Sequence, residues 1–234
     1  RLPGGLEATV TLDPSTHWPG WRSTTATCLG LIAGFALASS LDHWGWTIRS
    51  EPWRETDVYW AIMSLGKVQV WLVIAAALVL IDSGRLDTDG LRATWRRGPY
   101  LAASVVLSGL LAEGLKLVLR RSRPRDLDGH YEWHAWSDQL PSGHFGLPSS
   151  HVAVACAGVF ALWFLVPRAR PVLALGVVGI CYARVAPGQH FLSDVYVGAV
   201  LGWFVPWVIA RVHAGIGASR ARAELARPGA GAAA

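Results

Sequence analysis

Long apolar stretches, separated by short polar or charged segments, follow one another from residue 24 to residue 212. An apolar stretch of about 20 residues is long enough to cross the hydrocarbon core of a bilayer as an α-helix. Six stretches of this kind, some a few residues shorter, are candidates for membrane-spanning helices: 24–41, 67–82, 98–119, 149–166, 171–185 and 190–212. The pattern therefore predicts an all-α fold, an integral membrane bundle of six helices.

The apolar run from residue 58 to residue 81 is interrupted by Gly66 and Lys67. A straight helix would place Lys67 well inside the bilayer, which is energetically unfavourable. We predict a short interfacial helix at 58–65, followed by the span at 67–82, with Lys67 reaching the membrane surface. The preceding segment, 42–57, is mixed and charged and is predicted to be a surface loop.

Three regions follow from this pattern: an N-terminal segment at 1–23, a membrane domain at 24–212 and a tail at 213–234. The first segment has no apolar core and contains several prolines, so we do not expect a cleavable signal peptide. The tail ends in a Gly/Ala-rich stretch and is expected to be disordered.

The overall composition agrees with a membrane protein. Hydrophobic residues make up 52% of the chain and charged residues only 16%, whereas soluble domains carry about 25% charged residues. Many of the 13 tryptophans fall at the edges of the apolar runs, where indole rings favour the membrane interface. The net charge of +5 suits anionic lipid. The arginines are too dispersed, and the chain too apolar, for a nucleic-acid partner.

The distribution of arginines predicts the orientation in the membrane. With six spans both termini share a side with the arginines of 83–97 and 167–171, and the positive-inside rule makes that side the cytoplasm. The loop at 120–148 and the turn at 185–190 then lie on the outer face, which in a bacterium is the periplasmic face of the inner membrane. Several arginines break the rule on this face and indicate a bound anion: Arg120, Arg121, Arg123, Arg125 and Arg184.

The first candidate cluster consists of Lys116 and Arg123. A separation of seven residues is about two helical turns, so both side chains would project from one face of a helix. The helix is predicted to end near Ser122, because Pro124 disfavours helix at the residue before it. An ammonium and a guanidinium together suit the oxygens of a phosphate. The alternative is a basic flank of a membrane span, since further arginines lie there.

The second cluster, Pro148-Ser149-Ser150-His151, begins a predicted helix with Ser149 as its N-cap. The first-turn N–H groups and the helix dipole bind anions, and His151 would lie beside the anion and donate a proton. A capped helix with an interfacial histidine is the alternative. Pro141-Ser142-Gly143-His144 offers a second histidine. The residues after His144 do not favour a helix, which makes His151 the better candidate.

The third cluster consists of Arg184, His190 and Asp194. His190 and Asp194 are four residues apart at the predicted start of the last helix, so they share a face. The carboxylate can hold the imidazole Nδ1–H, which leaves the other ring nitrogen free to attack phosphorus or to move a proton. The alternative is an isolated His–Asp surface pair, and it weakens because all three clusters fall on the outer face.

Together the clusters resemble the signature of the type 2 phosphatidic acid phosphatase superfamily, which includes membrane lipid phosphatases and vanadium haloperoxidases. The three parts K-x6-R-P, P-S-G-H and S-R-x5-H-x3-D correspond here to Lys116-x6-Arg123-Pro124, Pro148-Ser149-Ser150-His151 and Arg184-x5-His190-x3-Asp194. Ser150 stands in place of the glycine and Ala183 in place of the serine. The resemblance covers about residues 58–212, and the six-span layout is similar to that of the family.

The resemblance implies a role for each matched residue. His190 would attack phosphorus and form a phosphohistidine, Asp194 would orient His190, and His151 would protonate the leaving group. The phosphate would be bound by the remaining polar residues of the signature: Lys116, Arg123, Arg184, Ser149 and Ser150. The resemblance to the lipid phosphatases of the family implies that no metal and no other cofactor is needed. His130 and His134 are four residues apart but lack a clear third ligand, so no metal is expected there.

The predicted function is that of an integral membrane phosphatase, which hydrolyses a lipid phosphate or diphosphate at the outer membrane face. Candidate substrates in a bacterium are undecaprenyl diphosphate, phosphatidylglycerophosphate, phosphatidic acid and a lipid A phosphate. Two alternatives stay open: a lipid phosphotransferase that passes phosphate from His190 to an acceptor lipid, and a non-catalytic membrane protein that binds anionic lipid. The membrane bundle disfavours a haloperoxidase. The sequence pattern leaves the oligomeric state open.

Overall fold

All regular elements in the described part of the chain are helical. The computed structural model describes residues 24–50, 52–83 and 90–225. The α-helices are α1 (Thr24–Ser40), α2 (Asp42–Thr47), α3 (Asp57–Ser64), α4 (Val68–Ser83), α5 (Gly90–Leu119), α6 (Ser150–Leu165), α7 (Arg170–Val185) and α8 (Leu192–Leu225). Four short 3-10 helices lie between them: η2 (Pro52–Glu55), η3 (Pro124–Leu127), η4 (Ser142–His144) and η5 (Pro167–Ala169). The predicted all-α fold is confirmed.

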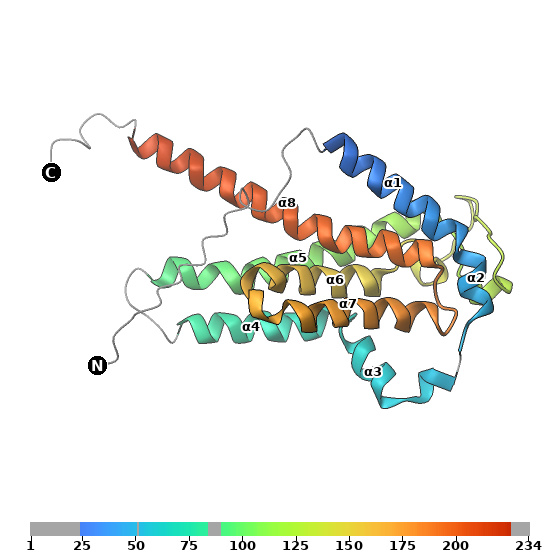
Figure 1. Cartoon of the computed structure of the whole chain (residues 1–234). Helices are drawn as coiled ribbons and strands as arrows, with labels where there is room; N and C mark the ends of the chain where they lie inside the picture. Colours follow the sequence, from blue (N-terminus) through green and yellow to red (C-terminus); the bar gives the residue numbers. More distant parts are fainter. Residues whose placement is uncertain (1–23, 51, 84–89, 226–234) are drawn as a thin grey trace, which may run out of the picture.

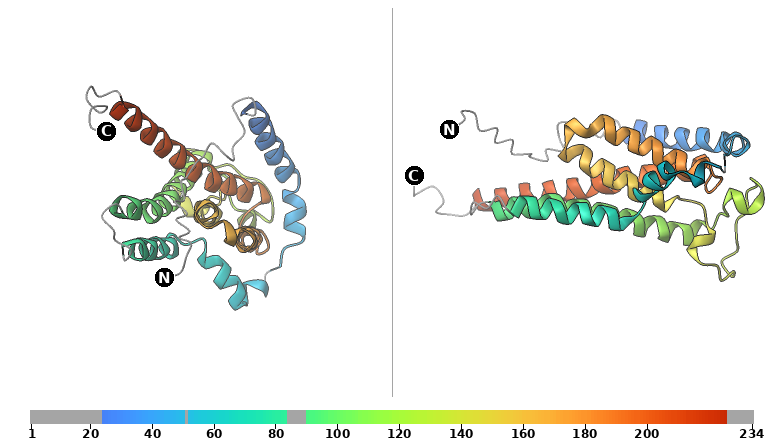
Figure 2. Two further views of the ribbon diagram at one scale, coloured as in Figure 1. Left: turned by 60° about the vertical axis from the view of Figure 1, so that its left-hand side comes forward. Right: turned by 90° about the horizontal axis from the view of Figure 1, so that it is seen from below.

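Helix α6 lies at the centre of the bundle, in contact with α5, α7 and α8, while α4 packs along α5 (Figure 1). The end of α5, the start of α6, the end of α7 and the start of α8 meet at one end of the bundle. Helix α2 and the segment 120–149 cover the same end, on the right in Figure 1 and in the right-hand view of Figure 2. All three predicted clusters therefore come to one end of the protein.

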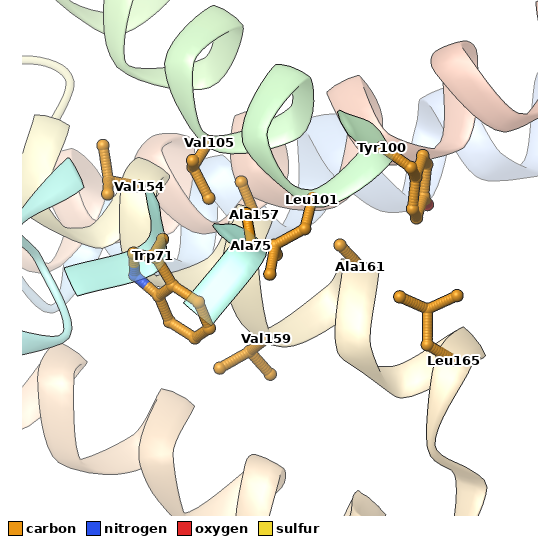
Figure 3. Close-up of a cluster of buried hydrophobic side chains, with 10 residues drawn as sticks. All are labelled: Trp71, Ala75, Tyr100, Leu101, Val105, Val154, Ala157, Val159, Ala161 and Leu165. Carbon is orange, nitrogen blue, oxygen red and sulfur yellow. The ribbon is translucent and has the colours of Figure 1, made fainter. Parts of the chain in front are cut away.

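The core consists of small and branched side chains from α6, packed against larger ones from α4 and α5 (Figure 3). Trp71 of α4 is buried, and its indole N–H donates to the carbonyl of Leu65 at 2.6 Å. Gly158 of α6 makes room for this ring, because a Cβ there would lie 2.3 Å from the Trp71 indole. The apolar contacts thus hold α4 and α5 against one face of α6.

Helices α6 and α8 approach each other closely through Gly198 and Gly202. A Cβ on either glycine would lie 2.6 Å from a backbone oxygen of α6 or its N-cap, that of Ser149 or of Ala153. Small residues spaced four apart bring helix backbones together in membrane proteins, where water provides no hydrophobic driving force between helices. This packing fixes the first two turns of α6 against α8 at Gly198 and Gly202.

The predicted break in the second apolar run is confirmed. Helices α3 and α4 are bent by 61° relative to each other, and the break contains Gly66 and Lys67. Lys67 is exposed, as expected for a lysine excluded from the bilayer. Gly66 is buried against His151, since a Cβ at this position would lie 2.7 Å from the His151 Cδ2. The bend therefore also forms a wall beside the start of α6.

Some of the predicted spans form helices that are too short to cross a membrane when judged by length and composition alone. Among the described residues, Arg97–Leu119 and Leu192–His213 are long and apolar enough, and the bent α3–α4 pair adds a third candidate. Helix α1 and the segment Ser150–Trp163 are apolar but shorter. Helix α1 has no buried side chain, and its outward face includes Leu29 and Ile32. Such a face suits contact with lipid.

Several predicted boundaries are wrong. The segment 42–57 is not simply a surface loop, because it contains α2 and η2 and buries Asp42. Helix α5 begins at Gly90, inside the predicted 83–97 loop, and ends at Leu119 because Arg120 takes a left-handed conformation with φ of 55°.

Helix α8 begins two residues later than predicted, at Leu192, and continues to Leu225. It therefore extends past residue 213, where the disordered tail is expected to begin. Alanine and arginine are common beyond that point, and both are strong helix formers. The expected N-terminal segment 1–23 and the residues 226–234 lie outside the described residues.

Candidate active site

Three hydrogen bonds join the three predicted clusters into one site. The Lys116 Nζ, in the last turn of α5, donates to the Ser150 Oγ at 2.8 Å. The backbone N–H of Ser149 donates to the carbonyl of Asp194 at 3.0 Å. The Arg123 Nη1 donates to the Oε1 of Gln189, next to His190, at 3.4 Å. The structure thus brings together residues that are up to 78 positions apart in the sequence, from Lys116 to Asp194.

Two guanidinium groups at this site lack an acidic partner among the described residues. Arg184, in the last turn of α7, is only 5% exposed, and its side chain contacts the sulfur of Met63 at 3.7 Å. The Nε atoms of Arg184 and Arg123 are buried without a hydrogen-bond partner, and neither residue forms an ion pair within the described part of the chain. A buried cation is costly unless it is paired. The arrangement therefore fits a bound anion.

His190 lies in the turn before α8, not in the helix as predicted, and is 3% exposed. Its backbone N–H donates to the carbonyl of Arg184 at 3.1 Å, which fixes the turn. Burial, reinforced by the charges of Arg184, Arg123 and Lys116, holds the pKa of His190 well below its ordinary value. His190 is therefore neutral at physiological pH, which is the protonation state that a nucleophilic imidazole requires.

Asp194 lies beside His190, as the spacing predicts, but the contact is long. The Nδ1 of His190 is 3.5 Å from the Oδ2 of Asp194, and it has no hydrogen-bond partner among the described residues. The same Oδ2 accepts the backbone N–H of Phe191 at 2.9 Å. This N–H keeps the carboxylate in place, so a small movement of the ring is enough to form the His–Asp hydrogen bond.

Arg121 was expected only as one of the outer-face arginines that indicate an anion, and its contact with Asp194 was not predicted. Its guanidinium pairs with the Oδ1 of Asp194 and donates to the Ser193 Oγ at 2.8 Å, and both charged side chains are buried. The guanidinium also packs over aromatic rings, at 5.1 Å from that of Phe191 and 5.2 Å from that of Tyr131. The available signal was an arginine on the outer face that no part of the phosphate signature used.

Asp42 connects α2 to this network. It is 2% exposed, and its Oδ1 accepts the backbone N–H of Ser193 at 2.8 Å. Its Oδ2 accepts the hydroxyls of Ser193 and Tyr131, the latter at 2.6 Å. Desolvation, with the nearby Asp42, raises the pKa of Tyr131 above its ordinary value, so the phenol stays protonated and donates. Asp42, Ser193, Arg121 and Asp194 thus form one connected polar network, which holds the Asp194 carboxylate beside His190.

The segment after α5 folds back over the same carboxylate. The backbone N–H of Gly146 donates to the carbonyl of Arg121 at 2.7 Å, and a Cβ on Gly146 would lie 2.9 Å from the Oδ2 of Asp194. The Nε2 of His134 lies 2.6 Å from the Ser122 Oγ, and its Nδ1 lies 3.6 Å from the Oδ2 of Asp138. His134 thus contributes to the folding of this segment.

The first turn of α6 presents two serines and His151. Ser149 occupies the predicted N-cap position, but its hydroxyl makes no capping bond and is buried without a partner among the described residues. That hydroxyl is free to donate to a ligand. His151 is half-buried and follows Ser150, which accepts from Lys116, whereas His144 is exposed in η4. His151 therefore stays the expected histidine of the site.

Comparison with known proteins agrees with this geometry. A sequence model described as the PAP2 superfamily matches residues 98–217, just over half of the 234 residues, and includes every residue of the three clusters. The chain belongs to the PAP2 superfamily. The predicted resemblance to the type 2 phosphatidic acid phosphatases is thereby confirmed, as is the prediction of an integral membrane protein.

Two curated relatives in this superfamily are lipid A 1-phosphatases. The protein from Rhizobium etli is 30% identical over 175 residues, which cover 67% of this chain and 74% of the relative. The protein from Rhizobium johnstonii is 32% identical over 147 residues, which cover 57% of this chain and 59% of the relative. The structure is similar to that of a transmembrane PAP2-type phosphatidylglycerolphosphate phosphatase from Bacillus subtilis, with a TM-score of 0.53 and 21% identity over 80% of this chain and 95% of that one. This likeness shows the shared fold.

Proposed function

We propose that this chain is a metal-independent lipid phosphatase, which forms a phosphohistidine on His190 at the outer face of a bacterial inner membrane. One observation carries the proposal: the buried Arg184 and the half-buried Arg123, neither with an acidic partner among the described residues, surround a buried neutral histidine. A phosphoryl group supplies the missing negative charge. The cations then stabilise the charge that develops on its oxygens in the transition state.

The orientation of His190 determines which nitrogen attacks. Its Nδ1 faces Asp194 at 3.5 Å, so Nε2 is the atom left to attack phosphorus. A bond forms between Nε2 and phosphorus while the bond to the leaving oxygen breaks, and His151 gives its proton to that oxygen. Asp194 stabilises the positive charge that remains on the His190 ring. Water then hydrolyses the phosphorus–nitrogen bond and releases phosphate.

The substrate is proposed from the relatives and from the position of the site. The curated relatives are named for the 1-phosphate of lipid A. The site lies at the end of the bundle formed by the 120–149 segment, which the arginine distribution predicts to be the outer face. We therefore propose a phosphorylated lipid of the outer leaflet, with a lipid A phosphate as the first candidate.

Phosphate release from a panel of lipids tests this function. The purified chain is incubated in detergent and EDTA with lipid A, phosphatidic acid, phosphatidylglycerophosphate and farnesyl diphosphate. We expect release from at least one of them, and a loss of at least about a thousandfold in His190→Ala, as for removal of a nucleophile elsewhere. His130→Ala, which changes an exposed histidine of the 120–149 segment, is the matched control.

Several results would contradict parts of the proposal. Full activity in His190→Ala would exclude the phosphohistidine, and activity that depends on an added metal would exclude metal independence. A phosphorylated acceptor lipid formed in place of free phosphate would identify a phosphotransferase. Release from no lipid of the panel would exclude the phosphatase activity.

A further inference from the structure

Glu113 is an acidic side chain in direct contact with the phosphate-binding cations. It lies one turn before Lys116 on α5, and the Lys116 Nζ donates to its Oε1 at 2.7 Å. The Lys116 side chain is 3% exposed, whereas that of Glu113 is 42% exposed, so the carboxylate stands at the edge of the site. The same Lys116 Nζ also donates to the Ser150 Oγ at 2.8 Å. These contacts hold the carboxylate in a defined position.

This carboxylate is connected through Lys116 to the start of α6, which carries the proposed proton donor. Lys116 joins Glu113 to Ser150, and the next residue along α6 is His151, the proposed proton donor. The nucleophile His190 comes instead from the turn between α7 and α8. In an in-line displacement the leaving oxygen lies opposite the attacking nitrogen. We therefore place Glu113 nearer to the leaving group than to the nucleophile.

The charges at the site match a phosphate monoester. Lys116, Arg123 and Arg184 bring three positive charges, and Glu113 removes one of them. The charge of Arg121 is already balanced by Asp194. The remaining excess of two equals the charge of a phosphate monoester dianion. A diphosphate brings additional negative charge on its leaving side, where Glu113 would repel it.

The same carboxylate helps proton transfer to an alcohol. An alkoxide is a poor leaving group and needs the proton of His151, whereas a phosphate leaves readily without it. Negative charge near an imidazole favours its protonated form. Glu113 pairs with Lys116, whose Nζ also donates to Ser150 next to His151, so its negative charge offsets part of the positive charge on this side of the site. This effect promotes the cleavage of monoesters in particular.

We infer that Glu113 makes the site selective for lipid phosphate monoesters over lipid diphosphates. The inference rests on the proposed phosphatase function and specifies its substrate class. Glu113 acts on the leaving-group side and takes no part in bond formation. The bond from phosphorus to the leaving oxygen breaks, the His151 proton goes to that oxygen, and the phosphoryl group goes to His190.

Glu113→Gln removes the negative charge but keeps the contact, because the amide oxygen can still accept a hydrogen bond from Lys116. The kcat/KM values for farnesyl phosphate and farnesyl diphosphate, which differ by one phosphate on the same lipid, are compared in the wild type and the variant. We expect the wild type to prefer the monophosphate. We expect the monophosphate-to-diphosphate ratio to fall in Glu113→Gln on the order of tenfold, which corresponds to about 1.4 kcal/mol of charge repulsion. Glu132→Gln, the same change at an exposed site of the outer loop, should leave the ratio unchanged.

Two further variants control for shape and folding. Glu113→Asp keeps the charge and should retain most of the preference, and Glu113→Ser repeats the test if the glutamine variant does not fold. An unchanged ratio in the charge-removing variant, or a wild type that prefers the diphosphate, would overturn the inference and leave the phosphatase function intact. A wild type that releases phosphate from neither farnesyl lipid nor the wider panel would instead overturn the function itself.

Discussion

Replacing Arg121 with methionine removes the guanidinium that pairs with Asp194 but keeps a long apolar stem against the surrounding aromatic rings. Both charged side chains are buried. Loss of one partner of a buried ion pair leaves the other charge uncompensated and costs about 3–5 kcal/mol. We therefore expect Arg121→Met to lower the free energy of unfolding by that amount. Arg125→Met is the control: its exposed pair with Asp126, at 3.9 Å, is worth about 0–1 kcal/mol.

A double-mutant cycle distinguishes the coupling energy of this ion pair from a general loss of stability. The free energy of unfolding is measured in mixed micelles for Arg121→Met, Asp194→Asn and the double variant. Because the double variant leaves no charge of this pair unpaired, it should be more stable than the sum of the single changes predicts, by about 2 kcal/mol or more. A coupling energy near zero, or an Arg121→Met variant within about 1 kcal/mol of the wild type, would refute the reasoning.

The activity of the same variants tests the role of Arg121 in positioning. Without its counter-charge a buried carboxylate takes up a proton and no longer stabilises an imidazolium. We expect the kcat of Arg121→Met to fall nearly as far as that of Asp194→Asn, and Arg121→Lys to recover part of it. Folded Arg121→Met with the kcat of the wild type would show that Asp194 needs no such partner.

Burial and the neighbouring cations lower the pKa of His190, so its ring should stay neutral in NMR titrations of the unliganded protein to well below pH 6.5, about the ordinary value. On lowering the pH, the unfolded state binds this proton before the folded state does, so the free energy of unfolding falls as pH drops below about 6.5. An NMR titration midpoint for His190 at or above that pH would contradict the expectation. Gly66→Ala, whose Cβ would lie 2.7 Å from the His151 Cδ2, should lower kcat by about tenfold or more by displacing the proton donor. Gly114→Ala has open space and should leave kcat unchanged, and equal kcat values in the two variants would disprove the displacement. Gly202→Val places side-chain atoms against the backbone of α6 and should destabilise the protein by about 1–3 kcal/mol in the same unfolding assay; no loss of stability would show that the helices can separate at little cost.

The positions that could be predicted are those for which local spacing carries the information. Lys116 falls in the last turn of α5 and Arg184 in the last turn of α7, because the polar residue comes near the end of an apolar run in each case. The break at Gly66 and Lys67 could also be predicted, because a lysine in the middle of a continuous membrane helix would be energetically unfavourable.

The contacts that could not be predicted join residues far apart in the sequence. Arg121 and Asp194 are 73 positions apart, and Asp42 and Ser193 are 151 positions apart. Each of these residues, taken alone, has an ordinary explanation as a flanking or surface residue. Only the packing of α2 and the start of α8 brings them together and buries them. Helix ends were also uncertain, since the left-handed turn at Arg120 depends on how the 121–149 segment folds back over the site.

The long-range contact between Asp42 and Ser193 has a consequence for how the protein is assembled in the membrane. A chain emerges from the ribosome N-terminus first, so α1 and α2 are made before the partner of Asp42 exists. Helix α1 buries no side chain of its own, and Tyr196 of α8 holds it through a hydrogen bond to the Leu31 carbonyl at 3.0 Å. Although α1 is synthesised before the other described helices, we therefore expect it to pack against the bundle only after α8 has been made.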